Sequence, residues 1–399
     1  MGFLGVLIVN IALFSDTYLP EINGVATSTD NLASTLRAHG HKVIVVTTNP
    51  FSSNMTFEND VIRIPGVELK MIYGYQFARL YNQEAAKIIE RFHPDVIHCQ
   101  TDFSVGIFGA LMARKLHCAT VYTFHTMMED YAYYVTHGHF DRLARHVVRG
   151  FFREKTAHYD AIIAPSDKIR DYLRVVGIDA SIYVIPTGIE FERFSIANEN
   201  KKETMTLKQK FGIKPNEFVI LSLGRVAKEK SIDVLLRGYK KFLDNGEPCP
   251  TKFVITGWGP AEGELKNLAH SLGIEEKVVF TGKVAQNETH KYYHLGDCFA
   301  SASVTETQGL TFMEAMGASL ITLARYDDNL VGTIQDGQTG FFFFDENDFT
   351  DKLNHVIALK PKEKAKIQAQ ALEAIDLYSL EHFYENIMEV YSRVVRQNW

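Results

Sequence analysis

The chain has 399 residues, which predicts about two domains because a typical domain holds roughly 100–200 residues. It is 46% hydrophobic and 23% charged, an ordinary balance for a soluble globular protein. Its net charge of −6 excludes a global attraction to nucleic acid or to anionic lipid, so any such attraction would need a local basic patch. We therefore expect no nucleic-acid partner.

The apolar N-terminus, Met1 to Phe14, is predicted to be a buried first strand. It has no basic n-region and no small-residue cleavage site, unlike a signal peptide. It is also too short to span a bilayer, which takes about 20 apolar residues, and no other stretch is long enough. Any membrane contact is therefore expected to be peripheral. No CxxC pair is present, and Cys99 and Cys298 lie in apolar runs, so we expect free thiols in a reducing cytosol.

Short apolar runs alternate with amphipathic segments through the first half of the chain. Strands are predicted at Val6–Phe14, Lys42–Thr48, Asp95–Cys99, Ala119–Thr123, Ala161–Ala164 and Ile182–Ile185. Helices are predicted between several of them, at Asn31–His39, Gln83–Phe92 and Val105–Lys115. Strand and helix repeated in this order indicate a parallel sheet covered on both faces.

The alternation pauses after Gly188, where a polar, lysine-rich stretch follows at Asn198–Lys210. It resumes with predicted strands at Phe218–Leu223, Phe253–Thr256, Val278–Thr281, Cys298–Ala302 and Leu320–Leu323. We predict an α/β protein of two Rossmann-like, doubly wound domains, residues 1–188 and 189–379. Residues 380–399 form a C-terminal helix that packs back on the first domain. Ligands of such sheets bind in the crevice at the strand ends, here expected to be shared between the domains.

The usual nucleotide-binding loops are missing. The segment after the first strand, residues 15–25, holds one glycine instead of the three of GxGxxG, and Gly257-Trp258-Gly259-Pro260 lacks the third. No P-loop appears. A two-domain dehydrogenase is therefore not supported.

A different anion site is predicted in two loops. Gly224 to Ser231 follows a strand and carries Arg225 and Lys230, two cations suited to a diphosphate. The run from Glu306 to Glu314 follows another strand, and a helix is predicted to start near Gly309. The amides of Gly309 and Leu310 would then point at an anion with the positive end of the helix behind them. Two carboxylates beside a phosphate site suit the hydroxyls of a hexose and a ribose.

With these motifs the chain resembles the retaining glycosyltransferases of family 4, which have the GT-B fold. The likeness rests on the E-x7-E pair (Glu306 and Glu314), the Gly-Arg…Lys loop (Gly224, Arg225, Lys230), an N-terminal glycine (Gly24) and a histidine (His125 in Thr123-Phe124-His125-Thr126), in the expected order across nearly the whole chain.

A narrower resemblance, to bacterial diacylglycerol glucosyltransferases, the monoglucosyldiacylglycerol synthases, rests on four segments. They are Phe14-Ser15-Asp16-Thr17-Tyr18-Leu19-Pro20, Tyr122–Thr126, Ala227-Lys228-Glu229-Lys230-Ser231-Ile232 and Tyr326-Asp327-Asp328-Asn329. Two positions depart from the family pattern: no proline follows Gly317, and Trp258 stands where an acidic residue is common.

This resemblance implies UDP-glucose as donor, diacylglycerol as acceptor and an α-linked glycolipid as product. It implies a donor site made by Gly24, Arg225, Lys230, Glu306, Gly309, Leu310 and Glu314, with His125, Arg225, Lys230 and Glu306 taking part in catalysis. Glu314 would hold the ribose, Glu306 the hexose, and His125 would orient the sugar from the other domain. No HExxH and no Asp-x-Asp appears, so we expect neither a metal nor another cofactor, with Arg225 and Lys230 in the metal's place.

The acceptor side is predicted to meet an anionic membrane at the cytoplasmic face. From Phe140 to Phe152 apolar residues recur at i, i+3 and i+4, while arginines occupy the opposite face. The predicted membrane contacts are Arg142, Arg145, Arg149, Phe151, Phe152 and Arg153. An ordinary core helix would show the same pattern.

Three alternatives stay open at this point. The same chemistry could serve another acceptor, such as phosphatidylinositol, a polyprenyl lipid or a second sugar. A UDP-sugar epimerase could use the same fold without an acceptor. A nucleotide-sugar-binding protein without turnover would not need the full set of charged residues.

Overall fold

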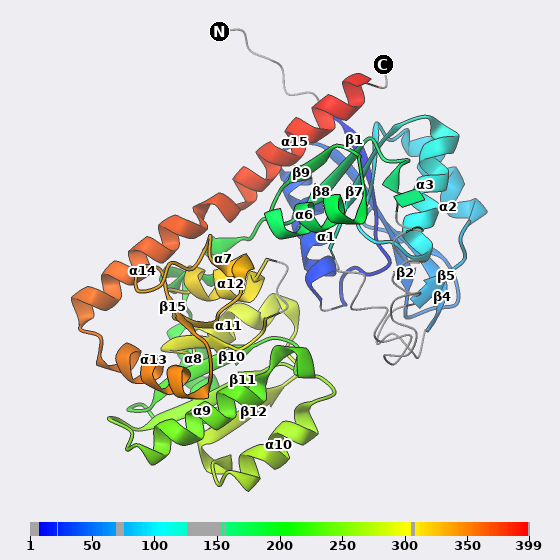
Figure 1. Cartoon of the computed structure of the whole chain (residues 1–399). Helices are drawn as coiled ribbons and strands as arrows, with labels where there is room; N and C mark the ends of the chain where they lie inside the picture. Colours follow the sequence, from blue (N-terminus) through cyan, green and yellow to red (C-terminus); the bar gives the residue numbers. More distant parts are fainter. Residues whose placement is uncertain are drawn as a thin grey trace. The chain divides into compact units, whose positions relative to one another are not determined.

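The computed structural model describes residues 8–21, 23–68, 76–125, 150, 153–154, 156–304 and 308–397. The chain divides into two compact units (Figure 1). Unit 1 runs to Gly188 and also includes the segment from Leu380 onward, whereas unit 2 spans Ile189–Ser379. Each unit is built on a largely parallel sheet, so the predicted class of two Rossmann-like α/β domains is confirmed.

The sheet of unit 1 has the strand order β3-β4-β2-β1-β6-β7-β8-β9, and β5 pairs with β4. Its strands are β1 (Asn10–Phe14), β2 (Lys42–Asn49), β3 (Thr56–Glu58), β4 (Val61–Glu68), β5 (Gln76–Ala78), β6 (Val96–Cys99), β7 (Ala119–Thr123), β8 (Ala161–Ala164) and β9 (Ile182–Val184). The pairings of β3 and β5 with β4 are antiparallel, and the other pairings are parallel. Only β3, β4 and β5 escaped the sequence prediction.

Helices cover both faces of this sheet. They are α1 (Gly24–Ala38), α2 (Gln83–Phe92), α3 (Ser104–Leu116), α6 (Asp167–Val176) and α15 (Leu380–Gln397). Two successive residues of β1 point to opposite faces of the sheet. Leu13 packs in the apolar cluster that includes residues of α1 and α15, and Phe14 packs against Phe108 of α3. Both side chains are fully buried, which is why this strand reads as a continuous apolar run.

The sheet of unit 2 has the order β12-β11-β10-β13-β14-β15, and its pairings are all parallel. Its strands are β10 (Phe218–Leu223), β11 (Thr251–Thr256), β12 (Val278–Gly282), β13 (Cys298–Ser301), β14 (Ile321–Arg325) and β15 (Phe341–Phe343). Counted within the unit, this is the Rossmann order 3-2-1-4-5-6, in which the chain changes direction across the sheet between the first and fourth strands.

Unit 2 also holds helices on both faces of its sheet. They are α7 (Phe191–Phe194), α8 (Lys201–Lys210), α9 (Ile232–Asp244), α10 (Glu262–Ser271), α11 (Thr289–Tyr293), α12 (Leu310–Gly317), α13 (Glu346–Ala358) and α14 (Pro361–Ile375). The lysine-rich stretch that followed the first half is therefore a helix, α8. Its N-cap residue Asn200 accepts a hydrogen bond from the Glu203 amide, and Thr204 is its one buried residue.

The C-terminal helix α15, red in Figure 1, lies against α1 and β7 of unit 1. A buried stripe that includes Phe383, Ile387 and Val390 joins the apolar cluster beneath it. Polar contacts fix its register, because the Tyr391 hydroxyl lies 2.8 Å from Nδ1 of the buried His98. Within the described residues, no helix combines the length and the apolar character needed to cross a bilayer.

Replacing Ile387 with alanine is expected to destabilise unit 1 by about 2–5 kcal/mol, because the change empties a buried site. Glu385→Ala, on the exposed side of α15, is the matched control and should cost no more than about 0.5 kcal/mol. Hydrogen exchange read by mass spectrometry checks this locally: amides of β6 and β7 should lose protection while those of β10 and β13 keep theirs. Equal losses in both units would contradict the assignment of α15 to unit 1.

Candidate functional site

In unit 2 the predicted site residues follow the two strands at which the strand order reverses. β10 ends at Leu223 and is followed by Gly224 and Arg225, while β13 ends at Ser301 and leads to α12. β10 and β13 are direct neighbours and run parallel, so their carboxyl ends lie side by side. Open parallel sheets bind ligands at such a point, because the loops there leave in opposite directions and open a crevice.

The loop after β10 is held by the backbone of the loop after β11. The Gly224 amide donates to the Thr256 carbonyl at 3.0 Å, and the Val226 amide donates to the Trp258 carbonyl at 3.1 Å. This close approach requires glycine opposite: a Cβ on Gly257 would lie 1.9 Å from the Gly224 oxygen, and one on Gly259 2.2 Å from the Val226 oxygen. The two-glycine loop that failed as a dinucleotide motif therefore serves to fix the Arg225 loop in place.

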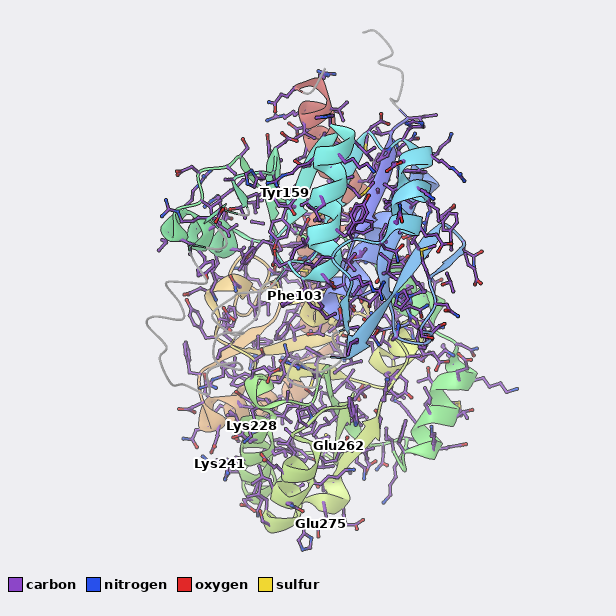
Figure 2. The ribbon with its side chains drawn as sticks, turned by 90° about the vertical axis from the view of Figure 1, so that its right-hand side faces the viewer. Phe103, Tyr159, Lys228, Lys241, Glu262 and Glu275 are labelled. Atoms are coloured by element: carbon purple, nitrogen blue, oxygen red, sulfur yellow. The ribbon has the colours of Figure 1, made fainter. Side chains whose placement is uncertain are left out.

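The two predicted cations of this loop, Arg225 and Lys230, differ in exposure and in their surroundings. The exposed Arg225 forms an ion pair with Glu229, four residues on in the same motif. Lys230 is half-buried and ends the short helix η2 (Lys228–Lys230), in which Lys228 is labelled in Figure 2. Lys228 itself is exposed and lies 3.7 Å from Glu264 of α10. The pairing of Arg225 with Glu229 was not predicted, although both residues stood in the quoted motif.

The helix α12 begins after Gly309, as the sequence indicated. Gly309 has φ 77°, and a Cβ there would lie 2.4 Å from Cδ2 of Leu330, so only glycine fits. Within the described part of the chain, the structure records no acceptor for the amides of Gly309 and Leu310. These free donors and the positive end of α12 together favour an anion.

Glu314 lies inside α12 and is buried. Its Oε2 accepts a hydrogen bond of 2.7 Å from the Tyr293 hydroxyl of α11. Burial raises the pKa of this carboxyl to about 7, while the Tyr293 hydrogen bond and the charge of Arg193 act in the opposite direction. Tyr293 was not predicted from the sequence, because it belongs to a different helix and no spacing links it to Glu314.

In unit 1 the predicted residues also follow strand ends. His125 stands two residues after β7 and is half-buried, and its Nε2 lies 2.7 Å from Oε1 of Gln100. Burial lowers the pKa of His125 to about 4, so its imidazole is neutral at physiological pH. Gly24 is the first residue of α1, where the side chain of Asn23 caps the helix by accepting from the Ala26 amide.

The aspartate that follows the first strand proves to be a helix cap. One carboxylate oxygen of Asp16 accepts from the Ser104 hydroxyl at 2.7 Å and from the Val105 amide at 2.8 Å, at the N-terminus of α3. The other accepts from the Thr101 hydroxyl at 2.6 Å. Burial raises the pKa of Asp16 despite these hydrogen bonds. The residue therefore fixes the loop between β6 and α3, whose last residue Phe103 is labelled in Figure 2.

Some of the predicted residues lie outside the described part of the chain. They are Glu306, Arg142, Arg145, Arg149, Phe151 and Phe152. Arg153 is described, and it is an exposed helical residue. Both cysteines predicted in apolar runs, Cys99 and Cys298, are buried, and neither forms a disulfide. Among the described residues there is no group of three or more His, Cys, Asp or Glu side chains that could hold a metal ion.

Comparison with known families matches both units. Residues 22–193 match the family described as Glycosyltransferase Family 4, and residues 203–373 match Glycosyl transferases group 1. Two proteins named alpha-monoglucosyldiacylglycerol synthase are similar over nearly the whole chain. The one from Streptococcus pneumoniae (strain R6) is 35% identical over 393 residues, covering 97% of this chain and 86% of its own. The one from Acholeplasma laidlawii is 33% identical, covering 97% and 98%.

Solved structures show the same fold at lower identity. The Anabaena protein HepE, solved in complex with UDP-glucose, superposes with a TM-score of 0.74 at 17% identity and covers 96% of this chain and all of its own. WaaG, a glycosyltransferase involved in lipopolysaccharide biosynthesis, superposes with a TM-score of 0.67 at 18% identity, covering 94% and 99%.

The raised pKa of Glu314 makes the stability of unit 2 depend on pH. Because the unfolded carboxyl, with a pKa of 4.5, loses its proton before the folded one, stability should fall as the pH rises from about 4.5 to about 7. The loss is on the order of 2–3 kcal/mol, and Glu314→Gln should not show it. Hydrogen exchange of the β10 and β13 amides in increasing urea, at about pH 5 and about pH 8, measures the difference. Parallel pH dependences in parent and variant would contradict the assignment.

Proposed function

The chain belongs to glycosyltransferase family 4 and has the GT-B fold, and on that premise we propose that it transfers glucose from UDP-glucose to 1,2-diacylglycerol. The product would be an α-monoglucosyldiacylglycerol. Family membership makes the chain a hexosyltransferase, whereas the donor, the acceptor and the stereochemistry are the proposal. The observation that carries it is the Arg225 loop beside the α12 N-terminus at the β10–β13 strand ends, and nearly full-length similarity to two synthases of this glycolipid supports it.

The donor diphosphate is proposed to bind at the strand ends of unit 2. Arg225 and Lys230 would meet its oxygens, and the free amides of Gly309 and Leu310 would donate to it from the start of α12. The diphosphate would replace Glu229 as the partner of Arg225, since it offers more negative charge and two oxygens for the guanidinium fork. Donors fixed in this way stabilise the charge that develops as the C1–O bond to phosphate breaks.

The sugar and ribose hydroxyls are assigned to the carboxylates. Glu314 would hold the ribose with the oxygen that Tyr293 leaves free, and Glu306 would hold the hexose. Gly24, at the start of α1, would give the glucosyl group and its phosphate close access to the backbone of unit 1. His125 would accept a hydrogen bond from the hexose, which its neutral imidazole permits.

Retention of configuration is proposed to follow from attack on the same face as the leaving group. The acceptor hydroxyl forms the new bond to C1 as UDP departs, and a phosphate oxygen of UDP takes the hydroxyl proton. The charge on that oxygen would be held by Arg225 and Lys230, so this step needs no metal ion. Activity that vanished on chelation and returned with one divalent ion would contradict this part of the proposal.

The decisive experiment is incubation of the protein with labelled UDP-sugars and diacylglycerol, followed by analysis of the lipids. Label in an α-glucosyl lipid supports the proposal. Label in another lipid or in a second sugar would identify a different acceptor. Free UDP-sugars that interconvert while the lipid stays unlabelled would identify an epimerase.

Arg225→Ala and Lys230→Ala are each expected to lower kcat by about 10²–10³, because each removes a fixed charge contact to the leaving group. Lys228→Ala is the matched control: this lysine belongs to the same loop but is exposed and lies beside Glu264. Steady-state kinetics measures the effect, and circular dichroism checks the fold. Near-parent rates in both charge variants would place the diphosphate elsewhere.

The acceptor side is proposed to work at the cytoplasmic face of an anionic membrane through the predicted helix of residues 140–153. Each basic residue near such a surface contributes about 1 kcal/mol. Changing Arg142, Arg145 and Arg149 to glutamate should therefore abolish sedimentation with anionic vesicles, while activity on detergent-dispersed acceptor persists. Glutamate at Lys362, Lys364 and Lys366 of α14 gives the same change in net charge and serves as the control. Equal loss in both triple variants would show that net charge alone governs binding.

A further inference from the structure

The carboxyl ends of β6 and β7 carry two polar cross-strand pairs. Cys99 of β6 lies opposite Tyr122 of β7. Because side chains alternate between the two faces of a sheet, His98 and Thr123, the neighbours of these two residues, lie on the other face. On that face His98 pairs with Thr123, its Nε2 2.7 Å from the threonine hydroxyl. Two residues further along each segment, just past the ends of both strands, Gln100 pairs with His125, with 2.7 Å between Oε1 and Nε2.

These two pairs differ in what they leave unsatisfied. His98 uses both ring nitrogens, one on Thr123 and the other on Tyr391 of α15. His125 uses Nε2 alone, and within the described residues no hydrogen bond to its Nδ1 is recorded. Gln100 is 2% exposed, and its amide nitrogen is buried with no hydrogen-bond partner among the described residues.

A buried amide nitrogen without an acceptor lowers stability, so its presence at a strand end points to a ligand. Gln100 directly follows β6, which is the neighbour of β1 where the strand order of unit 1 reverses. Gln100 therefore lies at the strand-order reversal of unit 1, as Gly224 and the N-terminus of α12 lie at the strand-order reversal of unit 2.

We propose that Gln100 is the positioning residue of His125: its Oε1 holds the imidazole as the Nε2–H tautomer, so that Nδ1 accepts from a sugar hydroxyl while the free Gln100 amide donates to the same sugar. The identity of the sugar as the hexose of UDP-glucose rests on the proposed function, whereas the tautomer does not. The pair gives unit 1 one acceptor and one donor, the combination that neighbouring hydroxyl groups require.

The electrostatic surroundings keep this arrangement neutral. Burial lowers the pKa of His125 to about 4 and that of His98 to about 3, and a charge on His125 would lower the pKa of His98 further. Among the residues that the structure describes, no carboxylate is recorded as a hydrogen-bond partner of either ring. At physiological pH the imidazole of His125 is therefore neutral, so one ring nitrogen donates a hydrogen bond and the other accepts one.

The first test is nuclear magnetic resonance of the imidazole nitrogens, which needs no substrate. In the parent protein His125 should show a protonated Nε2 and an unprotonated Nδ1. Gln100→Leu should abolish this preference, and Gln100→Glu, which keeps an acceptor, should retain it. Thr123→Val is the matched control, because it removes the pair two residues earlier and should alter His98 while His125 keeps its tautomer. A parent His125 protonated at Nδ1, or a tautomer unchanged in Gln100→Leu, would overturn the proposal.

The second test is kinetic and separates positioning from folding. Gln100→Leu should lower kcat by about 10²-fold, as for a misplaced group, while the Kd for UDP, measured by calorimetry, stays at the parent value. Gln100→Glu should recover only part of kcat at alkaline pH, because it restores the acceptor for His125 and not the amide donor to the sugar. This partial activity should be lost on acidification at a higher pH than in the parent, because the carboxylate raises the pKa of His125. Failure of Gln100→Glu to recover activity beyond Gln100→Leu would overturn the proposal. An inactive parent with the expected tautomers would instead refute the proposed function.

Discussion

The chemistry of this chain depends on the reversal of strand order in each sheet. In unit 1 the reversal falls between β1 and β6, and in unit 2 between β10 and β13. At each point the loops that leave neighbouring strands turn to opposite faces, which opens a crevice at the strand ends. The Arg225 loop and the α12 N-terminus occupy one of these points, and Asp16 and Gln100 follow the strands at the other. A parallel sheet buried on both faces leaves few other places for polar side chains.

Charge is distributed unequally between these two strand-end regions. The loop of unit 2 brings Arg225, Lys228 and Lys230 together with one carboxylate, Glu229, and α12 adds the positive end of a helix. In unit 1 the groups near β6 and β7 are kept neutral by burial, as the lowered pKa values of His98 and His125 show. A positive region suits the diphosphate of the proposed donor, and neutral donors and acceptors suit the uncharged hydroxyls of its sugar.

The sequence predicted the central strands well, because burial on both faces leaves a run of apolar residues that is easy to recognise. It missed β4, in which Pro65 and Gly66 interrupt the pattern, and the three-residue strands β3, β5 and β15. It also missed α8, since a helix with one buried residue has no apolar stripe. Helix propensity and the Asn200 cap decide that segment, and neither is visible as periodicity.

Site residues were predictable where a single loop supplies them, and not where separate elements meet. Gly309 could be predicted because a glycine between a strand and a helix is a local sequence pattern, typical of an anion site at a helix N-terminus. The contact of Tyr293 with Glu314 joins α11 to α12, and that of Gln100 with His125 joins β6 to β7, so only the tertiary structure reveals them. Tyr293 and Gln100 matter because each determines which hydrogen-bonding atom of its partner remains available. A carboxylate with one oxygen already bound to Tyr293 presents only the other, and an imidazole with Nε2 engaged presents only Nδ1. For Glu314 and His125, the orientation and the free hydrogen-bonding atom are thus selected by a neighbour that no motif contains.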